Sequence, residues 1–183
     1  MEEDKLIKVV KQYLNNCRSG DWNHALRVVK WVKILGEGIN NLDLLITAAY
    51  IHDIGWANIL PKGKVDLDTV LKYEPQANKN SSKLINEVLQ KMNFSNKDIN
   101  TVVRLINAAD KHESVEEDEA IIVDADTLSK LCIEHLEEKF TKNSYKELIN
   151  LWDKELPTRF KTEKGKLLYP ELLEKLKKNF YNK

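Results

Sequence analysis

Apolar residues recur at spacings of three and four along almost the whole chain, and apolar and polar positions rarely alternate over several residues. The first spacing places apolar side chains on one face of an α-helix, whereas alternation is typical of a half-buried strand. The pattern therefore predicts an all-α protein. We expect helices at residues 6–14, 21–35, 42–54, 81–92, 99–109, 119–139, 145–156 and 170–181, and a short helix at 67–73 within a loop from 56 to 80.

The length and composition of the chain favour a single compact helical domain. Its 183 residues lie within the usual size range of one domain. Hydrophobic residues make up 42% of the chain, which is enough to build a core. Six glycines and four prolines are too few to punctuate the many short strands of a sandwich or barrel. We therefore expect residues 1–183 to fold as one unit.

The charge balance argues against two classes of partner. The 29 Lys and Arg residues equal the 29 Asp and Glu residues, so the formal net charge is zero. A general nucleic-acid binder, or a protein held on anionic membranes, needs an excess of basic residues. We expect neither function.

Nothing in the sequence predicts a membrane span or export. The most apolar stretch, residues 44–51, is far shorter than the roughly 20 residues that cross a bilayer. Residues 1–10 open with acidic side chains, where a secretory signal has basic ones. Cys17 and Cys132 lie in no CxxC pair, and reduced thiols are the simpler interpretation. The expected location is the cytoplasm.

Four polar side chains occupy positions where the pattern predicts burial. His24 has apolar residues four, seven and eleven positions after it, and Asp124 has them three before and four and seven after. His52 and Asp53 lie at the end of the most apolar predicted helix, which breaks at Gly55. A buried carboxylate without a partner costs several kcal/mol, so these acids must be capped, paired or bound to a metal.

Two imidazoles and two carboxylates form an open, mixed N/O ligand set. Such a set suits one divalent ion (Mn, Fe, Co, Ni, Zn or Mg) and leaves positions for water and substrate. Consecutive helical side chains diverge by about 100°. His52 and Asp53 can therefore bind the same ion only if it lies beside the end of their helix, which the break at Gly55 permits.

The segments around these residues resemble the HD-domain superfamily of metal-dependent phosphohydrolases. His24 stands in DWNHALRV, His52 and Asp53 in IHDIG, and Asp124 in IIVDADTL. The resemblance covers a core at about 21–131 and implies an all-α domain of the HD type, with helices at 140–183 packing on it. It also implies that the four residues bind one divalent ion, which activates water for attack on a phosphoester or phosphoanhydride.

The chain departs from two branches of this superfamily. Binuclear relatives add a histidine ahead of a serine-containing helix, where this chain has Asn78 and Asn80. We therefore expect one metal ion. The branch that cleaves cyclic dinucleotides has a lysine after HDIG and a GYP motif, whereas Trp56 follows HDIG here and no GYP is present.

The assignment of the acids leaves alternatives open. Asp53 or Asp126 could act as a general base, and either Asp124 or Asp126 could instead cap the start of a helix. Of the two aspartates in DAD, we favour Asp124 as the ligand because its face carries the apolar residues. His135 lies eleven residues after Asp124, about 16 Å along a single helix, so a structural role is favoured.

Several basic side chains are candidates for substrate contacts. Arg27, one turn after His24, could hold a phosphate in its guanidinium fork or form a salt bridge on the helix flank. Lys62 and Lys64 could bring charge to the same cleft or remain solvated. His112 stands in a polar run, and exposure is favoured over a substrate contact.

We therefore predict a cytoplasmic metal-dependent phosphohydrolase acting on a phosphorylated small molecule, with a nucleotide as the favoured substrate. The alternative is a catalytically weak HD module that binds a nucleotide or a protein as a regulatory domain. A homo-oligomer is compatible with both.

Overall fold

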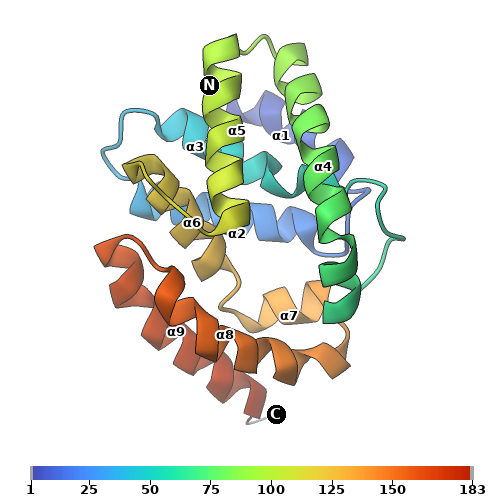
Figure 1. Ribbon diagram of the computed structural model, residues 1–183, viewed down its shortest axis with the longest axis vertical. Helices are drawn as coiled ribbons and strands as arrows, with labels where there is room; N and C mark the ends of the chain where they lie inside the picture. Colours follow the sequence, from blue (N-terminus) through green and yellow to red (C-terminus); the bar gives the residue numbers. More distant parts are fainter. Residues whose placement is uncertain (1, 182–183) are drawn as a thin grey trace.

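Helices form the framework of the part of the chain that the computed structural model describes, residues 2–181 (Figure 1). Within this range there is no strand, and one isolated β-bridge joins Val65 to Phe140. The prediction of an all-α fold is confirmed. No helix among the described residues is both long and apolar enough to span a bilayer. The α-helices are α1 (Glu3–Leu14), α2 (Asp21–Leu35), α3 (Leu42–Ile51), α4 (Leu67–Lys91), α5 (Asn96–Lys111), α6 (Glu117–Ser129), α7 (Ile133–Lys139), α8 (Tyr145–Arg159) and α9 (Glu163–Tyr181), and the 3₁₀ turns are η1 (His52–Trp56) and η2 (Lys142–Ser144).

Helices α2, α3 and α6 pack against one another in the middle of the molecule. Figure 1 shows α4 and α5 side by side at the end near the N-terminus, and α8 and α9 side by side at the opposite end. The short helix α7 lies between the central helices and the C-terminal pair. The middle of the fold is therefore covered from both ends, which suits a buried site.

Helix α6 is buried on almost every side. Ile121 and Ala125 belong to a core that α6 shares with α1 to α5, whereas Leu128 belongs to a second core shared with α7 to α9. Both aspartates of the DAD segment are buried, since Asp124 is 0% exposed and Asp126 is 6% exposed. Burial alone therefore cannot decide which of the two faces a site.

Residues 67–91 form one continuous helix, and the predicted division into a short helix, a loop and a second helix is wrong. The Asp66 carboxylate accepts the N–H of Thr69 at 2.7 Å and caps the start of α4. Pro75 lies inside the helix, where it removes a hydrogen bond. Tertiary contact offsets that loss because α4 packs closely on Gly55 of η1 through Ala77.

The predicted helix at 119–139 is also wrong in its length, because the chain turns after Ser129 and begins α7 at Ile133. The Ser129 hydroxyl donates to the carbonyl of Asp126 at 2.6 Å, a bond that competes with further helix. The last helix begins at Glu163, earlier than predicted. The turn brings α7 back beside α2, and this changes which residues can meet at the site.

Candidate metal centre

Four side chains from three separate elements converge in the middle of the fold. His24 comes from α2, His52 and Asp53 from η1, and Asp126 from α6. The Nε2 atoms of both histidines and one Asp126 oxygen lie within 4.8 Å of one another. The Asp53 Oδ2 atom is 3.7 Å from each Nε2. Two imidazoles and two carboxylates therefore face a common point.

A backbone carbonyl fixes which ring nitrogen of His52 carries a proton. Its Nδ1 atom lies 2.9 Å from the carbonyl oxygen of Ala49, one turn earlier in α3. A carbonyl can only accept a hydrogen bond, so Nδ1 carries the proton. In the neutral ring, the Nε2 atom of His52 therefore presents a lone pair to the site.

Ser129 fixes the protonation of His24 in the same way. The Ser129 hydroxyl gives its one proton to the Asp126 carbonyl at 2.6 Å. It must therefore accept from His24 Nδ1, which lies 3.1 Å away. The Nε2 atom of His24 also presents a lone pair, and burial lowers the pKa of this histidine to about 3, so the ring is neutral at pH 7.

The two Nε2 atoms and the Asp126 oxygen are all hydrogen-bond acceptors, and no proton lies between them. The two Nε2 atoms are 3.1 Å apart. Asp126 Oδ1 lies 3.1 Å from His24 Nε2 and is buried without a hydrogen-bond donor. Lone pairs this close repel one another unless a cation lies among them. A divalent ion fits this donor set, and the hydrogen bonds of Ala49 and Ser129 are the outer contacts that orient histidine ligands.

Both acids of the centre are ionised. Burial raises the pKa of the Asp53 carboxyl, but the cations of Lys139 and Arg18 outweigh this effect and hold the pKa well below its usual range. Burial also raises the pKa of Asp126. The Lys130 ammonium, 2.6 Å from Asp126 Oδ2, opposes this effect and helps to hold the pKa well below its usual range. Both carboxylates are therefore available to a cation at neutral pH.

Asp124 does not join these residues, and its predicted place beside the histidines is wrong. Its carboxylate accepts the N–H groups of Lys161 and Thr162, both at 2.8 Å, and the Thr162 hydroxyl at 2.6 Å. It thus binds the segment that starts α9. Asp126, two positions later on α6, points the other way and takes the place in the centre.

Gly165→Ala tests the assignment of Asp124 to this structural contact. A Cβ at residue 165 would lie 2.3 Å from Asp124 Oδ2, so the contact with Thr162 must break. Charged hydrogen bonds contribute roughly 1.5–3 kcal/mol. We expect the free energy of unfolding to fall by about 2 kcal/mol in urea titrations, with Mn²⁺ affinity unchanged. A parallel loss of metal affinity would contradict this division of roles.

The other residues considered for substrate contacts have different surroundings. Arg27 Nη1 pairs with Glu138 Oε2 at 2.8 Å, as in the salt-bridge interpretation. Its role as a phosphate clamp stays a prediction. Lys62 and Lys64 are exposed in the loop that follows η1. Trp56 is buried, and the Arg18 guanidinium lies 3.8 Å from its ring centroid.

Two further histidines lie outside the group of potential ligands. His112 ends α5 in a left-handed conformation, and desolvation and the charge of Lys130 lower its pKa to about 4. His135 is buried with its ring centroid 4.9 Å from that of His24. Sequence reasoning missed this contact, and also Lys139 and Arg18, because all three depend on the turn after α6 or on the loop before α2.

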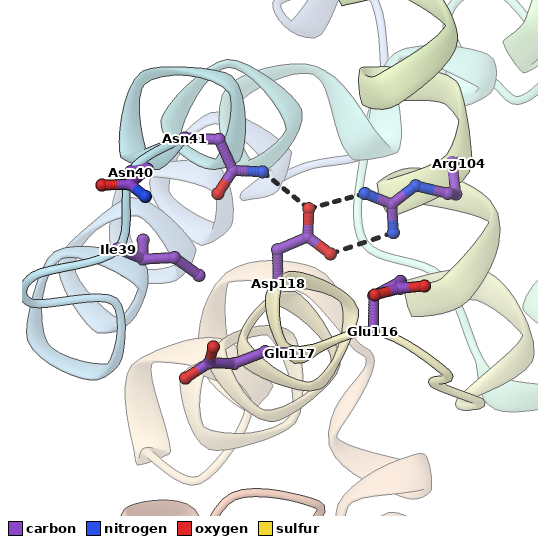
Figure 2. A pocket seen from close by; sticks show the side chains of 7 residues that line it. All are labelled: Ile39, Asn40, Asn41, Arg104, Glu116, Glu117 and Asp118. Atoms are coloured by element: carbon purple, nitrogen blue, oxygen red, sulfur yellow. Dashed lines mark hydrogen bonds and ion pairs between the residues drawn. The ribbon is translucent and has the colours of Figure 1, made fainter.

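A separate cavity of about 440 Å³ lies between the start of α6 and α5, away from the four side chains. Figure 2 shows its polar lining. Asp118 accepts Arg104 through both oxygens, at 2.9 and 2.6 Å, and Asn41 at 2.6 Å. Arg104 also pairs with Glu119 at 2.8 Å. These groups satisfy one another and hold α5 against α6, so we assign them a structural role.

Comparison with protein-family models matches residues 21–158 to the HD domain. The match covers about three quarters of the chain and includes His24, His52, Asp53 and Asp126. Comparisons with curated proteins and with solved structures give no significant match.

Proposed function

Because the chain belongs to the HD domain family, whose members are typically phosphohydrolases, we propose that it hydrolyses a phosphate ester or anhydride of a small molecule. Nucleotides are the first substrates to test. The observation that carries the proposal is the pair of lone-pair-bearing Nε2 atoms of His24 and His52, 3.1 Å apart. With the buried Asp126 oxygen beside them, they support a cation site.

His24, His52 and Asp126 would hold one divalent ion, and Asp53 would complete the set. This mixed N/O set suits Mn, Fe, Co, Ni, Zn or Mg. When bound, the ion would supply Lewis-acid chemistry, lowering the pKa of a water molecule and offsetting charge on phosphoryl oxygens. The burial of His24 and His52 excludes bulk water and strengthens these electrostatic effects.

The remaining roles follow from the charges around the centre. A general base works best when its pKa is near the working pH. The low pKa values of Asp53 and Asp126 therefore favour ligand roles over the base role. Arg27 stays a candidate for binding a phosphate.

A metal-reconstitution screen tests the proposal. Protein stripped with a chelator would be reloaded with each of the six metals and assayed against nucleoside mono-, di- and triphosphates and generic phosphoesters. We expect release of phosphate or pyrophosphate that depends on added metal. The Asp126→Asn variant should be inactive under the same conditions, because it loses an ionised ligand.

Hydrolysis that survives both the chelator and Asp126→Asn would contradict the proposal. Binding of a nucleotide without turnover under any metal would favour the regulatory module instead. Equilibrium binding of the same nucleotides, measured alongside the assay, separates these two results.

A further inference from the structure

The Asp53 carboxylate faces the two histidines and also contacts two cationic side chains. Its Oδ2 atom accepts a hydrogen bond from Lys139 Nζ at 3.1 Å and forms an ion pair with Arg18 Nη2 at 3.0 Å. Both cations also contact the buried Asp21, Lys139 at 2.5 Å and Arg18 at 3.1 Å. Two cations and two carboxylates therefore form one closed network beside the candidate metal centre.

This network is deeply buried and electrically balanced. Asp21 is 0% exposed, Lys139 is 3% exposed and Arg18 is 6% exposed. Two positive and two negative charges cancel, as buried ionic groups require. Because Lys139 is buried, solvent screens its charge only weakly. Its electrostatic effect on neighbouring groups is therefore larger than that of a lysine in a surface ion pair.

The same Asp53 oxygen serves both the network and the centre. Oδ2, which accepts Lys139, is also the atom 3.7 Å from the Nε2 atoms of His24 and His52. An ammonium at this oxygen and a divalent ion among the Nε2 atoms would repel each other.

We propose that Lys139 competes with the divalent ion for Asp53 and so sets the metal affinity of the centre. Lys139 is a positioning residue, acting through Asp53. Asp53 would hold the ion, and Lys139 would keep its contact with Asp21. This inference rests on the metal site of the proposed function.

Lys139→Met tests the competition directly, because methionine keeps much of the side-chain volume and removes the charge. Mn²⁺ binding to chelator-stripped protein would be measured by isothermal titration calorimetry. We expect the variant to bind Mn²⁺ about tenfold more tightly than the parent. Lys139→Gln, which keeps a donor for Asp21, should show the same direction and covers the case in which the methionine variant fails to fold.

Two controls separate competition from a general effect of losing a lysine. Lys33→Met removes an exposed cation paired with Glu3 and should leave Mn²⁺ affinity unchanged. In the Asp53→Asn background, Lys139→Met should no longer tighten binding, because the contested carboxylate is gone.

The outcomes distinguish this inference from the proposed function. Unchanged or weaker Mn²⁺ binding by both Lys139 variants, with normal binding by the parent, would overturn the competition alone. The same gain in the Asp53→Asn background would also overturn it. No Mn²⁺ binding by the parent would overturn the metal site, and the inference with it.

Discussion

Asp126→Asn is expected to weaken Mn²⁺ binding at least roughly a hundredfold and to abolish metal-dependent hydrolysis, whereas Asp124→Asn keeps both. The two aspartates are two residues apart on α6 and both are buried. Only Asp126 places an oxygen beside His24 Nε2, at 3.1 Å. Asp124 binds the backbone of Lys161 and Thr162 instead.

The pair forms a matched experiment, since each variant makes the same change in the same helix. Asp124→Asn should lower the free energy of unfolding by about 1–3 kcal/mol, because a neutral amide replaces the carboxylate that accepts three hydrogen bonds. Calorimetric metal titration and urea unfolding of both variants give the comparison. Loss of Mn²⁺ affinity in Asp124→Asn, with retention in Asp126→Asn, would restore the assignment made from sequence.

Gly55→Ala is expected to destabilise the protein by about 3 kcal/mol and to weaken metal binding as well. A Cβ at residue 55 would lie 2.3 Å from the Ala77 carbonyl oxygen and 2.9 Å from the Ser81 Cβ. The Ala77 oxygen belongs to the backbone and cannot rotate away, so η1 and α4 must separate. Because η1 carries His52 and Asp53, the displacement reaches the centre.

Gly38→Ala is the control for this substitution. Gly38 has a φ of +87°, and a Cβ added to it would have no atom within 4 Å. Alanine there therefore meets only backbone strain of about 1–2 kcal/mol. Urea unfolding and Mn²⁺ titration should show a larger stability loss for Gly55→Ala and a loss of affinity in that variant alone. Equal stability losses, or full metal affinity in Gly55→Ala, would show that α4 and η1 adapt without disturbing the centre.

Hydrophobic spacing was sufficient to predict an all-α fold, but not the bounds of several helices. The loop expected at 56–80 contains Pro75, yet packing of Ala77 on Gly55 keeps α4 continuous. The periodicity at 119–139 runs through the turn after Ser129, because residues on both sides of that turn are buried. Such tertiary contacts are not encoded in local pattern.

Only part of the candidate site could be predicted from sequence, because local patterns do not show tertiary contacts. His24, His52 and Asp53 stood out because they interrupt apolar patterns on separate helices, and the structure places them together. The choice between Asp124 and Asp126 failed because α6 is covered on both faces, so an apolar face does not identify the side that meets the histidines.

The approach of Lys139 to Asp53 had no signal in the sequence. The two residues are 86 positions apart, and they meet only because the chain turns between α6 and α7. A long-range contact of this kind follows from topology, which helical periodicity does not specify.

Anomalous scattering from crystals of the protein grown with Mn²⁺ tests the central claim most directly. We predict one strong peak bounded by the Nε2 atoms of His24 and His52 and by the Asp126 carboxylate, with Asp53 beside it. A peak held by Asp124, or no peak at the two histidines after saturation with Mn²⁺, would contradict the account.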